Sequence, residues 1–354
     1  MAVYWLLFAF FAVPALASAV NTPRNGRHPG AQNPFIPLML GGLVIVALVG
    51  LRYRVGADWD SYVLMFRYTA TKSLSDAVAV GEVGYQFVNW FAGNLGAEVW
   101  LVNLICAAIF TFGLVRFAQT QPHPWLVLVV AVPYLVIVVA MGYTRQAVAL
   151  GLLMAGLASR LQGASMLRIA AYVAVAAMFH RTAVVAFPLI ALATERSKLI
   201  NFLVAGTVTA LFYDLFLASE TKRFIVNYIE ARYASQGAAI RVTMCAIPAV
   251  AFFLFKNRFR FEESERLIWR NFSLMSVALL VLLFVLPSTT AVDRISLYLL
   301  PLQLAILPRI AGIFTTRGLG AAFVVLYSFM VQFTWLNYAV HAAWWVPYRF
   351  YPSG

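Results

Sequence analysis

The chain has 354 residues, of which 63% are hydrophobic and only 11% charged, and its formal net charge is +13. A soluble domain carries about 25% charged residues, and no soluble fold of this length hides so much apolar surface, so the composition excludes a soluble protein. The apolar residues come in long runs without the alternation of a membrane β-barrel. We therefore expect an all-α polytopic membrane protein.

The apolar runs predict about 11–12 transmembrane helices plus interfacial helices in a single integral membrane domain, residues 1–354. The runs lie at about residues 2–20, 36–52, 98–116, 125–142, 146–161, 167–180, 182–194, 199–217, 241–256, 271–287, 295–311 and 319–339. The first run ends in Ala-Leu-Ala-Ser-Ala, which resembles a signal-peptide cleavage site, but no Lys or Arg precedes Arg24. We therefore predict a retained helix with its N-terminus outside the cytoplasm.

Two longer connections are expected on the outer face of the membrane. Residues 53–97 form a periplasmic loop with an interfacial or re-entrant helix at 84–97, a segment too short and too polar to span the membrane. Residues 218–240 form a second periplasmic loop with Arg and Tyr side chains. This second loop is expected either to rest on the membrane surface or to cover a substrate.

The distribution of cations favours an anionic ligand on the outer face. With the N-terminus outside, the cytoplasmic loops hold a small excess of Lys and Arg, as the positive-inside rule requires, yet nearly half of the 26 cations remain outside. Arg offers a planar, permanently charged fork that suits phosphate or pyrophosphate. No metal site is expected, because Cys106 and Cys245 lie in apolar runs as packing residues and no Cys/His cluster has metal-ligand spacing.

Polar residues gather at the predicted outer ends of several helices, and the first group follows the second apolar run. Gly56 permits a tight turn there, and carboxylates alternate with aromatic rings in a way that suits a sugar. The group consists of Arg54, Asp58, Trp59, Asp60 and Tyr62. The same pattern is also typical of a loop that leads into a helix with Asp as its N-cap.

Two further groups open predicted helices. Glu82 and Tyr85 lie at the start of the interfacial helix, where they bind substrate or merely begin the helix. Arg145-Gln146 lies where one apolar run ends and the next begins, and a cation there costs free energy unless an anion compensates it. Snorkelling would explain Arg145 but not the neighbouring amide of Gln146, so both are predicted to contact the substrate.

The last groups lie in the second half of the chain. His180-Arg181 separates two short apolar runs. Asp293-Arg294 precedes another run, in which Tyr298 lies four residues after Arg294 and hence on the same helix face. Alternatively, Asp293 and Arg294 simply neutralise one another.

In this order, the motifs resemble the EpsG family of bacterial exopolysaccharide polymerases, a Wzy-like group. The resemblance covers about residues 40–310 and rests on Gly56-x-Asp58-x-x-x-Tyr62, Glu82-x-Gly84-Tyr85, Arg145-Gln146, Phe179-His180-x-Thr182-Ala183 and Arg294-x-Ser-x-Tyr298. Two positions depart from the pattern. Trp59 stands where Tyr is frequent, and Arg181 stands where a small or polar residue is frequent, which alters the charge presented to the substrate.

The resemblance implies a metal-independent glycosyltransferase with an all-helical fold of the GT-C type. Such an enzyme joins repeat oligosaccharides carried on undecaprenyl pyrophosphate, at the periplasmic face of the bacterial inner membrane. The growing glycan moves to the non-reducing end of a new lipid-linked unit. The implied partners are the lipid-linked donor and acceptor, membrane lipid and proteins of chain-length control or export; no cofactor and no nucleic acid is implied.

The chemistry of such a transfer assigns roles to the predicted residues. The leaving pyrophosphate needs cations, for which Arg145 is the first candidate, with Arg54, Arg181 and Arg294 as helpers. The acceptor hydroxyl needs a base, for which Asp58, His180 and Asp293 are candidates, and Asp58 is preferred. We therefore expect Asp58, Arg145 and His180 at the catalytic centre. The expected substrate-binding residues are Arg54, Trp59, Asp60, Tyr62, Glu82, Tyr85, Gln146, Arg181, Asp293, Arg294 and Tyr298.

Three other functions remain open from the sequence. An O-antigen ligase-like enzyme, or a transferase that uses a polyprenyl-phosphate sugar, needs the same arginines and histidine. A flippase for lipid-linked oligosaccharides needs polar residues in both halves of the membrane, and mid-span polar residues are sparse here. A scaffolding subunit of a secretion complex would tolerate substitution of Asp58, Arg145 and His180.

Overall fold

The computed structural model describes residues 1–21, 35–193, 198–218, 237–286, 288–314 and 316–352. The structure is 82% helical, with no strands among these described residues, which confirms the prediction of an all-α polytopic membrane protein. The described residues contain six helices that are long and apolar enough to cross a membrane, together with several shorter apolar helices. The six are Ala2–Ala19, Val99–Gln119, Ala238–Phe255, Glu263–Val285, Thr289–Ile310 and Gly318–Tyr338.

The described residues form sixteen α-helices. In chain order they are α1 (Ala2–Asn21), α2 (Phe35–Gly50), α3 (Trp59–Ala70), α4 (Leu74–Ala79), α5 (Val83–Asn94), α6 (Val99–Gln119), α7 (Pro124–Ala131), α8 (Thr144–Leu161), α9 (Met166–Phe179), α10 (Ala186–Ala191), α11 (Lys198–Phe212), α13 (Ala238–Phe255), α14 (Glu263–Val285), α15 (Thr289–Ser296), α16 (Leu300–Ile310) and α17 (Arg317–Tyr338). Short 3-10 or π-helical segments extend or link them: η1 (Val132–Ala140), η2 (Arg181–Val185), η3 (Tyr213–Leu217), η6 (Leu297–Leu299) and η7 (Val340–Trp344).

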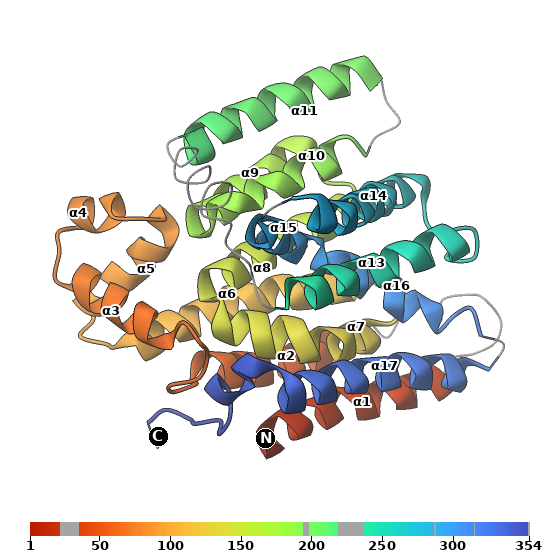
Figure 1. Cartoon of the computed structure of the whole chain (residues 1–354), viewed down its shortest axis with the longest axis horizontal. Helices are drawn as coiled ribbons and strands as arrows, with labels where there is room; N and C mark the ends of the chain where they lie inside the picture. Colours follow the sequence, from red (N-terminus) through yellow and green to blue (C-terminus); the bar gives the residue numbers. More distant parts are fainter. Residues whose placement is uncertain (22–34, 194–197, 219–236, 287, 315, 353–354) are drawn as a thin grey trace.

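The long helices run side by side as a bundle (Figure 1). Helices α1 and α17 pack together along one edge, and α11 lies at the opposite edge beside α10 (Figure 1). The first and last helices are tied by hydrogen bonds, since Gln332 Nε2 donates to the Tyr4 carbonyl (3.0 Å) and Tyr4 Oη donates to the Trp345 carbonyl (2.7 Å). These contacts hold the C-terminal segment against the core.

The packing of α6 on α8 fixes the helix that carries Arg145. The two helices cross at Gly113 and Gly151, so closely that a Cβ on Gly113 would lie 1.8 Å from the Gly151 carbonyl oxygen. Small residues at a crossing let two helix backbones approach, which is how membrane helices gain packing energy. This crossing fixes the position of α8 relative to α6.

Helices α3, α4 and α5 form a group at one end of the bundle (left in Figure 1). Helix α5 coincides with the predicted interfacial helix, but the preceding residues contain two more helices where we expected a loop. The Ser73 hydroxyl caps α4 by accepting from the Asp76 amide (3.2 Å), and Thr69 Oγ1 ties α3 to α5 by donating to Gln86 Oε1 (2.9 Å). The other predicted loop, 218–240, lies for the most part outside the described residues, and only its last residues, from Gly237, are seen entering α13.

Candidate functional site

The Gly56 motif packs against the residues that lead into α8. Gly56 adopts a φ of +106°, and a Cβ there would lie 2.5 Å from the Met141 carbonyl oxygen. Its amide donates to the Trp344 carbonyl (3.0 Å). Only glycine satisfies both the dihedral angle and the close approach. This turn ends at Asp58, the residue before α3.

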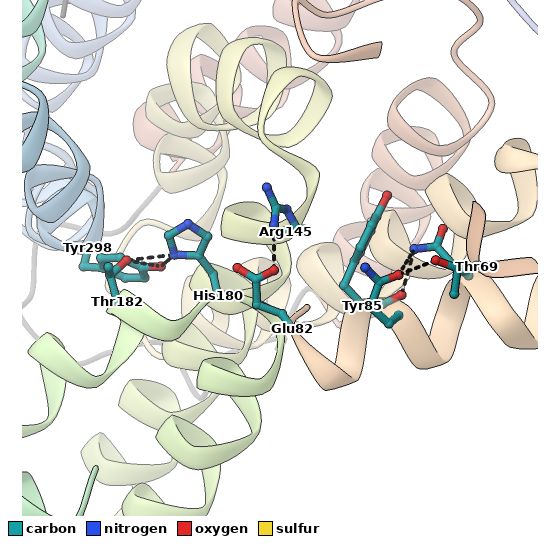
Figure 2. Close-up of polar contacts among 9 residues, drawn as sticks. Thr69, Glu82, Tyr85, Arg145, His180, Thr182 and Tyr298 are labelled. Atoms are coloured by element: carbon teal, nitrogen blue, oxygen red, sulfur yellow. Dashed lines mark hydrogen bonds and ion pairs between the residues drawn. The ribbon is translucent and has the colours of Figure 1, made fainter. Parts of the chain in front are cut away.

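Arg145 and Glu82 form an ion pair that joins α8 to α5. Arg145 is the second residue of α8, Glu82 is the N-cap residue of α5, and Arg145 Nη1 donates to Glu82 Oε2 at 2.6 Å (Figure 2). Arg145 also interacts with the buried Tyr62 of α3. Among the described residues, neither Arg145 Nε nor Gln146 Nε2 has a hydrogen-bond partner, although both atoms are buried. Two donors at the start of α8 are therefore left for an acceptor that the described part of the chain does not supply.

The start of α5 also contacts the histidine motif. A Cβ on Gly84 would lie 2.9 Å from Cε2 of Phe179, so α5 begins in close contact with the end of α9. Helix α9 ends at Phe179, and His180 is extended (φ −154°, ψ 110°) before η2 begins. This break confirms the predicted interruption between two short apolar runs and turns the imidazole out of both helices.

The imidazole of His180 meets two hydroxyl groups. Its Nδ1 lies 2.8 Å from Thr182 Oγ1 and 2.9 Å from Tyr298 Oη (Figure 2). Thr182 Oγ1 in turn donates to Tyr298 Oη at 3.4 Å. Residues from the fourth and the last motif, more than a hundred positions apart, thus fix the orientation of one ring.

Asp58 and His180 share two arginine neighbours, Arg145 and Arg294. Burial raises the pKa of the Asp58 carboxyl group, and the two guanidinium groups partly oppose that rise. Burial also lowers the pKa of His180 well below its ordinary value, and the same two guanidinium groups lower it further. Asp58 is therefore a stronger base than an exposed carboxylate, and His180 is a neutral imidazole at physiological pH.

The aromatic residues of the predicted site are packed rather than open. Trp59 is buried against Tyr53, with ring centroids 5.8 Å apart, and the buried rings of Tyr62 and Tyr85 lie 5.6 Å apart. Tyr85 Oη is buried without a hydrogen-bond partner among the described residues. The stacking of these rings on a sugar therefore stays a prediction, while the interaction of Tyr62 with Arg145 is an observed role.

Two predicted residues, Arg54 and Asp60, are exposed. The guanidinium of Arg54 lies over the Tyr53 ring, 5.4 Å from its centroid. Arg181 is half-buried at the start of η2, next to His180.

The sequence interpretation missed the partner of Asp293. Arg241 of α13 forms a bidentate pair with that carboxylate, with Nε 2.6 Å from Oδ1 and Nη2 2.7 Å from Oδ2. Its position near the start of an apolar helix, like that of Arg145, is the signal that could have identified it. The pair lies within electrostatic range of Tyr143, which in turn interacts with Asp58.

Metal ligands are not gathered anywhere in the part of the chain that the structure describes, where no three His, Cys, Asp or Glu side chains are grouped to hold an ion. Cys106 and Cys245 are buried free thiols. The chemistry available at the site is thus that of guanidinium groups, a carboxylate, an imidazole and hydroxyls.

Contacts between neighbouring motifs make them one site at the end of the bundle near α3–α5. The Gly56 turn contacts the residues before α8, Arg145 binds Glu82, Gly84 packs on Phe179, and His180 contacts Tyr298.

A family model described as the EpsG family matches residues 35–350, nearly the whole chain. No curated protein and no solved structure matches the chain. Because the family match covers every motif of this site, the chain belongs to the EpsG family.

Proposed function

We propose that the chain is a polysaccharide polymerase of the periplasmic face of the bacterial inner membrane. It joins repeat oligosaccharides carried on undecaprenyl pyrophosphate, by transfer of the growing glycan to the non-reducing end of a new lipid-linked unit. Membership of the EpsG family supports an exopolysaccharide-polymerase type of function. The observation that carries the finer proposal is the start of α8, where a half-buried Arg145 and the adjacent Gln146 keep unpaired donors beside Asp58.

The leaving group is the first requirement of the reaction. The bond between the anomeric carbon and the diphosphate oxygen breaks, and undecaprenyl pyrophosphate departs with the bonding electrons and an additional negative charge. Arg145 and Arg294 stabilise this charge, and the unpaired Nε of Arg145 and Nε2 of Gln146 donate to phosphate oxygens. Glu82 holds the Arg145 guanidinium from its other side.

The acceptor hydroxyl is the second requirement. Its oxygen attacks the anomeric carbon and its proton passes to Asp58. The directions of the pKa shifts favour Asp58 over His180, since a raised pKa makes the carboxylate a better base and a lowered pKa makes the imidazole a poorer one. His180, held by Thr182 and Tyr298, then serves as a neutral hydrogen-bonding group for the sugar.

A reconstituted reaction tests the proposal. The purified full-length protein is placed in vesicles with synthetic lipid-linked repeat units, and the products are separated by size. A ladder of products that differ by whole repeat units is expected. A single added unit on a different acceptor would indicate a ligase, and transport of the intact substrate across the bilayer without a new glycosidic bond would indicate a flippase.

A further inference from the structure

Arg52 is a fully buried cation that has no place in the site described above. It follows α2 in the chain, and the residue is only 1% exposed. Nη1 donates to the Val49 carbonyl (2.6 Å), and Nη2 donates to Asn103 Oδ1 (3.1 Å) and Thr144 Oγ1 (2.8 Å). One guanidinium group therefore joins the last turn of α2, the second turn of α6 and the first residue of α8.

The charge of Arg52 lacks a carboxylate among the residues that the structure describes. All three acceptors are neutral, and its remaining nitrogen, Nε, is buried without a partner. Three other buried or half-buried arginines differ, because Arg145 pairs with Glu82, Arg241 with Asp293 and Arg309 with Glu265. A buried cation without a counter-charge is costly, and the carbonyl at the end of α2 offsets only part of that cost.

Backbone hydrogen bonds hold the C-terminal segment over Arg52 and keep its side chain away from solvent. The Tyr53 amide donates to the Arg349 carbonyl (2.9 Å) and the Tyr351 amide donates to the Leu51 carbonyl (2.8 Å), so the C-terminal segment covers this turn. Arg52 itself forms an isolated antiparallel bridge with Phe350. The position of the charge is therefore fixed relative to the bundle.

Arg52 contacts the start of α8. Thr144, which accepts its hydrogen bond, precedes Arg145 in the chain, and Tyr62 lies within electrostatic range of both arginines. Any anion that binds the unpaired Nε of Arg145 therefore approaches Arg52 as well. The field of Arg52 is weakly screened there, because the group is buried.

We propose that Arg52 is a positioning residue for the diphosphate of the lipid-linked donor, which supplies the counter-charge that the described residues lack. Through Thr144 it also keeps the first turn of α8, and with it Arg145, in place. The inference rests on the proposed function of the same site. The proposal gives Arg52 two effects. Attraction of the diphosphate needs only a positive charge, whereas the hydrogen bond to Thr144 needs the guanidinium.

Binding of farnesyl diphosphate to the purified full-length protein in detergent tests the inference. Arg52→Met is expected to weaken this binding about tenfold or more, the effect of one charge lost at roughly 10 Å in a partly buried setting. Arg52→Lys keeps the charge and is expected to bind within about threefold of the parent protein. Farnesyl monophosphate, with less charge, should lose less affinity in Arg52→Met than the diphosphate does.

Thr144→Val is the matched structural variant, since it cuts the link between Arg52 and α8 and leaves the charge. It is expected to slow polymer formation and to weaken the binding of farnesyl diphosphate less than Arg52→Met does, because the charge of Arg52 remains. Arg309→Lys, at a buried arginine with a carboxylate partner, is the control for a change of buried guanidinium elsewhere.

Several outcomes would overturn the inference. If the Arg52→Met protein binds farnesyl diphosphate as tightly as the parent protein, Arg52 has no role in positioning the diphosphate. If a folded Arg52→Lys protein binds as weakly as Arg52→Met, the geometry of the guanidinium matters and its charge does not. A loss in Thr144→Val equal to that in Arg52→Met has the same meaning. The Lys and Val variants keep the test valid if Arg52→Met fails to fold. A parent protein that binds diphosphate but makes no polymer would contradict the proposed function instead, and one that does not bind diphosphate would contradict both.

Discussion

Replacement of Glu82 by Gln removes the carboxylate that pairs with Arg145 and keeps the size and shape of the side chain. The Arg145 and Glu82 side chains are 30% and 17% exposed, so the pair lies between a surface pair and a buried one. Truncation of a buried pair costs about 3–5 kcal/mol, and exposed pairs contribute about 0–1 kcal/mol. We therefore expect Glu82→Gln to lower the free energy of unfolding by about 1–2 kcal/mol.

A double-mutant cycle with Arg145→Gln measures this coupling. Unfolding of the four proteins is followed in mixed micelles as the fraction of denaturing detergent rises. The single substitutions are expected to be non-additive by about 1 kcal/mol or more, because each one already breaks the same ion pair. Additive effects, within about 0.5 kcal/mol, would refute the pairing and the role given to Glu82.

Three further predictions concern single residues of the site. Gly56→Ala meets the Met141 carbonyl and a left-handed backbone, so we expect a loss of about 2 kcal/mol or more in stability and little folded protein, measured by size-exclusion chromatography and thermal unfolding; a normal melting temperature would contradict this. The lowered pKa of His180 means that the folded protein takes up a proton there less readily than the unfolded chain, so the melting temperature should fall as the pH falls through about 6.5, and His180→Gln should reduce that dependence. Because burial raises the pKa of Asp58, the acid limb of the rate profile should lie above the ordinary carboxyl pKa of 3.8, and Asp58→Asn should abolish polymer formation at every pH; an Asp58→Asn protein with normal activity would exclude its role as the base.

Much of the fold could be predicted from the sequence because each membrane-spanning helix is recognisable from its own run of apolar residues. A long apolar run has to be a helix, so the predicted runs correspond to helices such as α6 and α17. Helix α4 was not predicted, because it is short, and α3 entered only as the alternative in which Asp58 caps a helix. Their stability comes from packing on α5 and from caps such as Ser73, which depend on tertiary contacts.

The candidate site was predicted in its members but not in its pairings. The sequence indicated Arg145, Glu82, His180 and Tyr298 through motif order, and the structure pairs the first two and the last two. Which side chains meet depends on helix crossings such as that at Gly113 and Gly151, and no local pattern specifies them. The motifs nevertheless lie on elements that contact one another.

Arg52 and Arg241 show what the sequence could not reveal. Both lie at ends of apolar helices, where an arginine most often snorkels to the interface. Arg52 is instead buried among neutral acceptors and Arg241 is bound to Asp293, and only long-range contacts decide between these states. Counting cations therefore could not separate these two arginines from arginines at the membrane interface.

The most direct test of the account is the length distribution of the polymer made by Arg145→Ala protein. The variant is compared with the parent chain in membranes that contain equal amounts of inserted protein. The account predicts that no polymer forms, because the leaving diphosphate loses its main cation, while unextended lipid-linked units accumulate. Polymer of normal length from the inserted variant would contradict the assignment of this site to the pyrophosphate.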